Sequence, residues 1–390
     1  MSNWKTVNLC DICEINMGQS PKSEYYNTNC EGLPFLQGNR TFGAKYPTFD
    51  IYTNFSTKTA EVGDVIMSVR APVGDVNITP IKMCLGRGIC GLRHKDGEQE
   101  FLYYLMRYYS KDLIKRESGT VFGSINRNDI ATLNVSIPPL IEQIEIGQIL
   151  RVLDDRITIN EKINHHLEQI AQAIFKSWFV DFEPWDGKQP VNWHVAILGD
   201  LVQIIDNRGK TPPFAPMPTD YPIIDVKALS GSQRVVDFKN CTKFVEAEIY
   251  HSWFRSGHPQ SYDILLSTVG SLAEMKLFLG NRGCIAQNVV CFRSKMPLYL
   301  FQYLQYIKND LVSYNIGSVQ PSIKVTHITK HPILVPTDEI LQQFNEAMQS
   351  ITEEIYTNHC QSEHLATLRD TLLTRLMSGE LSVSDIVGGK

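Results

Sequence analysis

The sequence has no hydrophobic run approaching the roughly 18 apolar residues that a membrane-spanning helix needs. It starts without the apolar segment of a secretory signal. Its nine cysteines are odd in number and irregularly spaced, which is typical of a reducing compartment rather than of a disulfide framework. These absences argue against a membrane or secreted protein, and we expect a cytoplasmic one.

Signals for catalysis and metal binding are also missing. Cys10 and Cys13 have zinc-like spacing, but no second pair follows, and the alternating apolar stretch around them predicts a core. The ten histidines form no metal-binding pattern with a third ligand, and no nuclease-type cluster of two carboxylates and a lysine is present. Lys210–Phe214 (KTPPF) resembles the loop of adenine methyltransferases, but Thr211 replaces the required amide or acid, and no Gly-rich strand–turn–helix precedes it. We therefore predict no catalytic residue, metal or cofactor in this chain.

The net charge of −5 is unevenly distributed along the chain. Residues 1–140 carry 15 Lys and Arg against 14 Asp and Glu (net +1), and residues 187–336 carry 15 against 10 (net +5). Residues 141–186 carry 4 against 9 (net −5), and residues 337–390 carry 3 against 9 (net −6). Local charge, not the total, is what a phosphate backbone senses, so the two longer segments can still face nucleic acid.

The sequence is internally duplicated. Ser118–Asn126 (SGTVFGSIN) and Ile316–Lys324 (IGSVQPSIK) share Gly-(Thr/Ser)-Val-x-x-Ser-Ile, 198 residues apart. Further blocks match in the same order at offsets of 188 to 200: Trp4 with Trp193, Leu9–Ile12 with Leu198–Leu201, Gly18–Pro21 with Gly209–Pro212, Leu33–Leu36 with Tyr221–Ile224, Asp64–Ser68 with Asp263–Ser267, and Ile137–Pro138 with Val335–Pro336. Agreement in order over more than a hundred residues indicates a duplication, with insertions in the loops.

Each copy predicts a globular part of about 140 residues followed by one long helix. Strand-type runs at Asp64–Val69 and Asp263–Val269 precede helical stretches at Phe101–Ile114 and Leu298–Leu311, which predicts an α+β fold. The predicted segments are a first globular domain at 1–140, a central helix at 141–182, a second globular domain at 183–336, a C-terminal helix at 337–380 and a tail at 381–390.

The two acidic segments show the 3.5-residue apolar spacing of coiled coils. Both place an asparagine, Asn160 or Asn358, at the same position of the repeat, where a buried asparagine fixes register. We expect the helices to pair with each other as an antiparallel coiled coil; the alternative is that each helix packs on its own domain. The predicted pairing residues are Ile149, Leu153, Asn160, Ile163, Leu167, Ile170, Ile351, Asn358, Leu365 and Leu368.

Several motifs, in their order and duplication, carry a family resemblance. They are Gly63–Gly74 (GDVIMSVRAPVG), Ser118–Val121 (SGTV), Ile137–Gln143 (IPPLIEQ), Ser177–Pro184 (SWFVDFEP) and Leu372–Leu381 (LLTRLMSGEL). In this order the sequence is similar to the specificity (S) subunit of type I restriction-modification systems. The resemblance covers essentially the whole chain; each motif alone is weak.

The resemblance implies a non-catalytic subunit that recognises double-stranded DNA. Two target recognition domains would each read one part of a bipartite site, and the paired helices would act as a ruler between them. The helices would also dock two modification (methyltransferase) subunits and, through them, restriction subunits. S-adenosylmethionine would then belong to the modification subunits, and ATP and magnesium to the restriction subunits. Two alternatives remain: a repeat scaffold that binds proteins alone, and a stand-alone DNA-modifying enzyme.

The candidate DNA contacts come from cations, amides and hydroxyls in turns. The shared motif offers Thr120 and Ser318 beside flexible glycines, although a turn that joins each domain to its helix is the alternative. Asn126 with Asp129 can cap a following helix. Arg70 can grip guanine, or it is an ordinary surface arginine. The full candidate set is Asn39, Arg40, Lys45, Arg70, Arg87, Thr120, Arg208, Lys210, Lys227, Arg234, Lys276, Gln287, Asn288 and Ser318.

Overall fold

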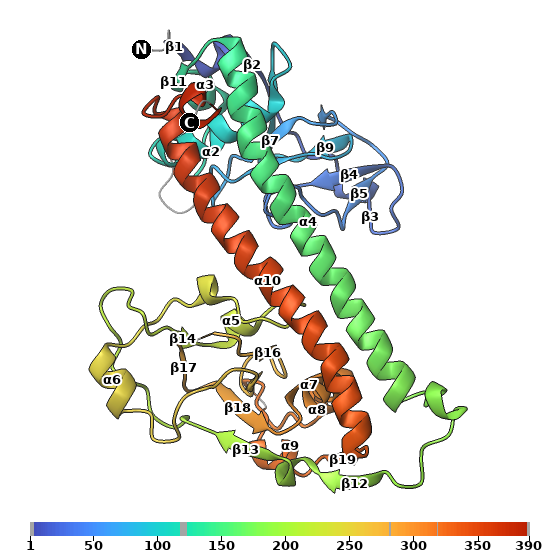
Figure 1. The fold of residues 1–390 in the computed structure, drawn as a ribbon. Coiled ribbons are helices and arrows are strands. Elements are labelled where there is room, and N and C mark those ends of the chain that lie inside the picture. Colours follow the sequence, from blue (N-terminus) through green and yellow to red (C-terminus); the bar gives the residue numbers. More distant parts are fainter. Residues whose placement is uncertain (1–3, 118–122, 281, 318, 388–390) are drawn as a thin grey trace. The chain divides into compact units, whose positions relative to one another are not determined.

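The computed structural model describes residues 4–117, 123–280, 282–317 and 319–387. The chain divides into two compact units: unit 1 is Met1–Thr158 with Glu363–Lys390, and unit 2 is Ile159–Ser362. Each unit contains one globular domain and part of both long helices, α4 (Leu140–Phe179) and α10 (Asp338–Met377) (Figure 1). Each helix has 40 residues and is therefore about 60 Å long. The α+β class and both long helices are confirmed, and the division between the units falls within the helices.

The domain of unit 1 is built on a four-stranded antiparallel sheet of order β2-β10-β7-β8. Its strands are β2 (Cys13–Met17), β7 (Val65–Ser68), β8 (Val76–Ile78) and β10 (Ile89–His94). A second sheet has the order β3-β5-β4-β9-β6, from β3 (Tyr26–Asn27), β4 (Leu33–Leu36), β5 (Tyr52–Thr53), β6 (Thr59–Ala60) and β9 (Met83–Leu85). The remaining elements are β1 (Lys5–Asn8) paired with β11 (Asn134–Ile137), and the helices α1 (Leu9–Ile12), α2 (Gln99–Ile114) and α3 (Arg127–Ala131).

The domain of unit 2 repeats the principal sheet in the equivalent order, β13-β18-β15-β16. These strands are β13 (Val202–Ile205), β15 (Ile264–Ser267), β16 (Met275–Leu277) and β18 (Val289–Ser294). Two strand pairs accompany it, β12 (His194–Ile197) with β19 (Pro332–Val335) and β14 (Ile223–Ile224) with β17 (Cys284–Ile285). Its short helices are α5 (Val226–Leu229), α6 (Ala247–Ser252), α7 (Pro297–Tyr306), α8 (Lys308–Ser313) and α9 (Val325–Ile328).

The uninterrupted apolar runs of β7 and β15 reflect burial on both faces of the sheet. Because strand side chains alternate, Val65 and Met67 pack in the cluster that contains residues of α2, and Ile66 packs with residues of β4 and β9. In β15 Ile264 and Leu266 pack in a different cluster from Leu265. The sheet is thus the middle layer of each domain.

The duplication extends to individual hydrogen bonds. The hydroxyl of Ser68 donates to Pro72 O (2.8 Å) and accepts from the N–H of Asp75 (2.9 Å). Ser267 makes the same two bonds, to Ser271 O (2.5 Å) and from the N–H of Glu274 (2.8 Å). The two domains therefore keep the turn that follows the central strand.

In unit 1 the two helices and the domain meet at a charged cluster. Arg369 of α10 donates to Asp154 of α4 at 2.5 Å, and the hydroxyl of Tyr104 of α2 donates to the same carboxylate at 2.6 Å. Asp154 is 5% exposed. Burial raises the pKa of Tyr104, and the nearby Asp154 charge adds to this shift, so the phenol stays protonated.

In unit 2 the two helices contact through asparagines. The amide of Asn160 donates to Ser362 Oγ (3.2 Å), and the amide of Asn358 donates to Asn164 Oδ1 (3.0 Å). Lower numbers on α4 meet higher numbers on α10, so the pairing is antiparallel, as predicted. The duplication offset of 198 converts one contact into the other, because it relates Asn160 to Asn358 and Asn164 to Ser362. The contact therefore has a local two-fold character.

Part of the predicted pairing set is wrong. Ile163, Ile170 and Leu368 are 37%, 48% and 40% exposed. The actual interface in unit 2 includes polar side chains that an apolar pattern omits, among them Asn164 and Glu168, and the true stripe is rotated away from these three residues. Asn160 and Asn358 are buried as predicted, whereas the other predicted pairing residues are partly buried: Ile149, Leu153, Leu167, Ile351 and Leu365.

Two smaller differences concern the ends of elements. The predicted helix at Leu298–Leu311 is divided into α7 and α8 at Ile307. The predicted tail contains α11 (Val383–Val387), whose Val383 is buried in the core of unit 1. None of the helices in the described ranges is long and apolar enough to cross a membrane.

Candidate nucleic-acid interface

Three turns and one further segment come together in each domain. In unit 1 the turn after β2 bonds to the β9–β10 connection, since Gly18 N–H donates to Ile89 O at 3.0 Å and Arg87 N–H to Ser20 Oγ at 3.1 Å. A side chain at Gly18 would put Cβ 2.2 Å from Gly86 O, so this close approach requires glycine. The turn after β7 joins the same group, because Val69 N–H donates to Gly88 O at 2.9 Å.

The fourth segment belongs to the repeated motif. Arg70 forms an isolated bridge with Ser124, and Val269 forms the equivalent bridge with Ser322. The asparagine cap predicted to follow is confirmed, because Asn126 accepts from the N–H of Asp129 at 3.1 Å and Asp129 accepts from the N–H of Asn126 at 2.8 Å. The motif therefore brings its turn against the end of the central strand in both copies.

Unit 2 assembles the same four segments. Gln287 of the β17–β18 connection donates to Thr211 Oγ1, and Thr268 N–H donates to Asn288 O at 2.8 Å. Arg208 links the turn after β13 to the turn after β15 through Thr268 Oγ1 at 3.0 Å. We call this surface the loop face. It comprises residues 18–21, 69–71, 86–88 and 123–125 in unit 1, and residues 206–212, 268–270, 286–288 and 321–323 in unit 2.

Several predicted DNA contacts lie on the loop face with free functional groups. Arg70 and Arg87 are exposed, and no ion pair holds either of them among the residues that the structure describes. Lys210 is exposed and Gln287 is exposed, at a backbone φ of 59°. Asn288 is half-buried. These side chains can hydrogen-bond to phosphate oxygens or base edges.

The loop face has different side chains in its two copies. Arg70 corresponds to Val269, Arg87 to Gln287, and Gln19 to Lys210. The backbone is shared, but the groups that it presents are not. Two surfaces of this kind would recognise different chemical patterns.

The comparison with known proteins agrees with this duplication. A family profile described as the type I restriction modification DNA specificity domain matches residues 1–169 and again residues 190–363. The chain belongs to this family. It thus contains two DNA specificity domains, and the family is one of DNA recognition rather than of catalysis.

Individual relatives support the same assignment. The chain is 25% identical over 426 residues to the type I restriction enzyme MjaIX specificity subunit of Methanocaldococcus jannaschii, covering 98% of this chain and 95% of that protein. A candidate MjaX specificity subunit from the same organism is 39% identical over 176 residues, but this match covers 44% of this chain and 41% of that protein. The crystal structure of the type I S subunit from M. genitalium has the same fold, with a TM-score of 0.61 at 15% identity and 96% coverage of both chains.

Three of the candidate cations of this specificity subunit are buried, so their predicted exposure is wrong. Lys45 is 4% exposed, its ammonium pairs with Glu100 at 2.9 Å, and three tyrosine rings surround it. Arg234 is 1% exposed and bonds to Glu168 of α4 and Thr352 of α10. Lys276 is 1% exposed and donates to the carbonyls of Gly231 and Gln233. Each cation serves the interior of its unit.

The remaining candidates are exposed or half-exposed but occupied to different degrees. Arg40 pairs with Asp50 at 2.5 Å, and Asn39 donates to Asp75 at 2.6 Å. Arg208 holds Asp206 with two side-chain hydrogen bonds, at 2.7 and 2.9 Å. Lys227 is exposed on α5. Thr120 and Ser318 lie outside the described residues.

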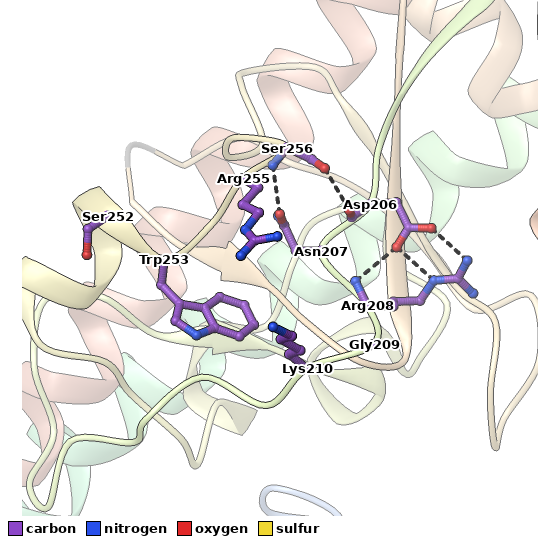
Figure 2. Close-up of a pocket in the computed structure, with 9 residues that line it drawn as sticks. All are labelled: Asp206, Asn207, Arg208, Gly209, Lys210, Ser252, Trp253, Arg255 and Ser256. Carbon is purple, nitrogen blue, oxygen red and sulfur yellow. Dashed lines mark hydrogen bonds and ion pairs between the residues drawn. The ribbon is translucent and has the colours of Figure 1, made fainter.

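Sequence reasoning missed two residues of the specificity subunit that lie close to the loop face. Trp253 and Arg255 line a pocket together with Lys210, and Figure 2 shows all three on the same side of it. The signal was a tryptophan and an arginine directly after a short helical stretch, which is a common pattern on any surface. Their meaning emerges once the fold brings them to Lys210.

No metal site accompanies these groups. In the described part of the chain, no group of three or more His, Cys, Asp or Glu side chains could hold a metal ion. Cys13 is 2% exposed, and burial raises the pKa of its thiol to about 12. The prediction that Cys13 belongs to the core is confirmed.

Proposed function

We propose that this chain reads a bipartite double-stranded DNA target, with one loop face on each part. The observation that carries the proposal is the loop face itself, built twice on the same backbone but with different side chains, such as Arg70 and Val269. An arginine that grips guanine through O6 and N7 discriminates by about 1–3 kcal/mol, whereas a valine can contact a thymine methyl group. The two parts of the target would therefore differ in sequence.

The helix pair would set the distance between the two parts. A 40-residue helix is about 60 Å long, which is longer than the ~34 Å of one turn of DNA. The asparagine contacts of unit 2 support a fixed register, because a sliding helix would leave buried amides without partners.

The helices would also dock two modification (methyltransferase) subunits and, through them, restriction subunits. This is supported by an exposed apolar face on α4, formed by Ile141, Val152, Ile159, Ile163 and Ile170. Their spacings of 11, 7, 4 and 7 residues are all close to whole helical turns, so the five share one side of the helix. S-adenosylmethionine would enter with the modification subunits, and ATP and magnesium with the restriction subunits, so methyl transfer would not occur on this chain.

Methylation mapping tests the proposal. The chain is expressed with the modification subunit encoded beside it, and the host DNA is sequenced for N6-methyladenine. We expect two short motifs at one fixed gap, and their loss when this chain is omitted. Methylation that persists without this chain would show that it is not the reader and would favour a scaffold that binds proteins alone.

A further inference from the structure

A pocket of about 560 Å³ lies in unit 2 between Asp206–Lys210 and Ser252–Ser256. Asn207, which is 7% exposed, joins its two walls: its amide donates to Gly257 O at 2.9 Å, and its oxygen accepts from Ser256 N–H at 3.0 Å. The hydroxyl of Ser256 also donates to Asp206 O at 2.7 Å. The walls are thus held together by buried hydrogen bonds, and the pocket is preformed.

The charge balance of the pocket is positive. Burial alone would raise the pKa of Asp206, but hydrogen bonds from Arg208 outweigh it and lower that pKa, so the carboxylate is ionised and paired. Figure 2 shows Arg208 turned toward Asp206, away from Lys210 and Arg255. Lys210 and Arg255 are both exposed, and neither has an ion-pair partner within the described ranges. The pocket therefore presents two uncompensated cations.

The third component is aromatic. Trp253 caps the C-terminus of α6, where its N–H donates to Ile249 O at 3.0 Å, and its ring packs edge-to-face on Phe254 at 5.0 Å. The indole is half-buried and forms part of the pocket lining. The matching part of unit 1, between its β4 and β7, contains no helix in the structure, so this wall is specific to unit 2.

We propose that this pocket binds the sugar–phosphate backbone of one DNA strand. Lys210 and Arg255 contact phosphates, and the indole of Trp253 packs against a deoxyribose. The inference rests on the proposed function and extends it, because Lys210 adjoins Thr211 and Gln287 of the loop face. Phosphate contacts fix the position of a protein on DNA without reading bases. The pocket thus anchors the second domain, and the loop face reads the sequence.

The experiment uses the complex of this chain with its modification subunit. Binding is measured over a salt series on two duplexes of equal length, one carrying the target found by methylation mapping and one of mixed sequence. Lys210→Ala and Arg255→Ala are compared with the wild type and with Lys330→Ala, which removes an exposed lysine elsewhere in unit 2. We expect each pocket variant to reduce the slope of log affinity against log salt by about one, and Lys330→Ala to leave it unchanged.

Tryptophan emission gives an independent measurement. The chain has five tryptophans, and the difference between the wild-type complex and Trp253→Phe isolates the signal of Trp253. We expect the target duplex to change this difference signal and a matched addition of salt to leave it unchanged. An unaltered signal on binding would show that DNA does not reach the indole.

The possible outcomes separate the pocket from the proposed function. If the wild-type complex does not prefer its target over the mixed duplex, the proposed function fails. If it does prefer the target but both pocket variants keep the wild-type salt slope, the pocket assignment alone is wrong. A changed methylation motif in Arg255→Ala would also overturn the assignment, because a phosphate contact weakens binding equally on all sequences.

Discussion

The buried pair of Arg234 and Glu168 gives the most demanding test of the structure. Arg234 lies in the second domain and Glu168 on α4, and two side-chain bonds join them, at 3.0 and 2.7 Å. Arg234 N–H also donates to Glu168 at 2.9 Å, and the guanidinium reaches Thr352 of α10 at 2.7 Å. One arginine thus connects its domain to both helices of unit 2.

We expect Glu168→Gln to destabilise unit 2 by about 3–5 kcal/mol, because it leaves a guanidinium that is 1% exposed without a counter-charge. That loss is a large fraction of the roughly 5–15 kcal/mol that stabilises a typical domain. The double variant Glu168→Met with Arg234→Met should recover most of it, since replacing both partners by apolar groups of similar size is often nearly neutral.

Urea unfolding followed by tryptophan fluorescence measures this effect. Trp178, Trp185, Trp193 and Trp253 belong to unit 2, so its unfolding dominates the signal. The matched control is Glu354→Gln, which changes an exposed carboxylate on α10 and should shift stability by no more than about 0.5 kcal/mol. If Glu168→Gln costs no more than this control, the buried ion pair does not hold the helices to the domain.

Three further predictions concern pH, recognition and spacing. Burial lowers the pKa of Lys276 from 10.5 to about 8, so the unfolded state binds more protons between these values and Lys276 should make stability rise with pH there; urea titrations from pH 7 to about pH 10 should show this rise reduced in Lys276→Met, and equal pH dependence of the two proteins would contradict it. Arg70→Ala should relax recognition at one base of one half of the target by about 1–3 kcal/mol and leave the other half intact, which methylation mapping would show; simultaneous change in both halves would count against separate readers. Matched removal of one turn from each helix, residues 163–166 and 356–359, removes the partners Asn164 and Asn358 together and shortens the pair by about 6 Å, so the mapped gap should shrink by about two base pairs; an unchanged gap would refute the helices as a ruler.

The duplicated architecture was predictable because it rests on order and periodicity. The matching blocks located the central strand of both sheets, and the asparagine at the same position of each helix located their contact. These signals are local, or they repeat within the chain, and therefore one sequence contains them.

The individual binding residues were less accessible. Lys276 and Lys210 look alike in the sequence, yet the fold buries the first against two carbonyls and exposes the second beside the loop face. Arg234 depends on Glu168, 66 residues earlier, and nothing near either residue indicates the other. The apolar spacing that placed Ile163 in the helix contact fits two sides of α4, and deciding between them requires the polar residues of the contact.

The asparagine contact of the helix pair bears on the direction in which this protein would read DNA. Two separate identical subunits related by a two-fold axis would read a palindrome, which looks the same from either strand. Here the contacts of Asn160 with Ser362 and of Asn358 with Asn164 bring a two-fold arrangement into a single chain, whose halves have been free to diverge. Under the proposed function its target would have a polarity, and the complex would bind DNA in one orientation.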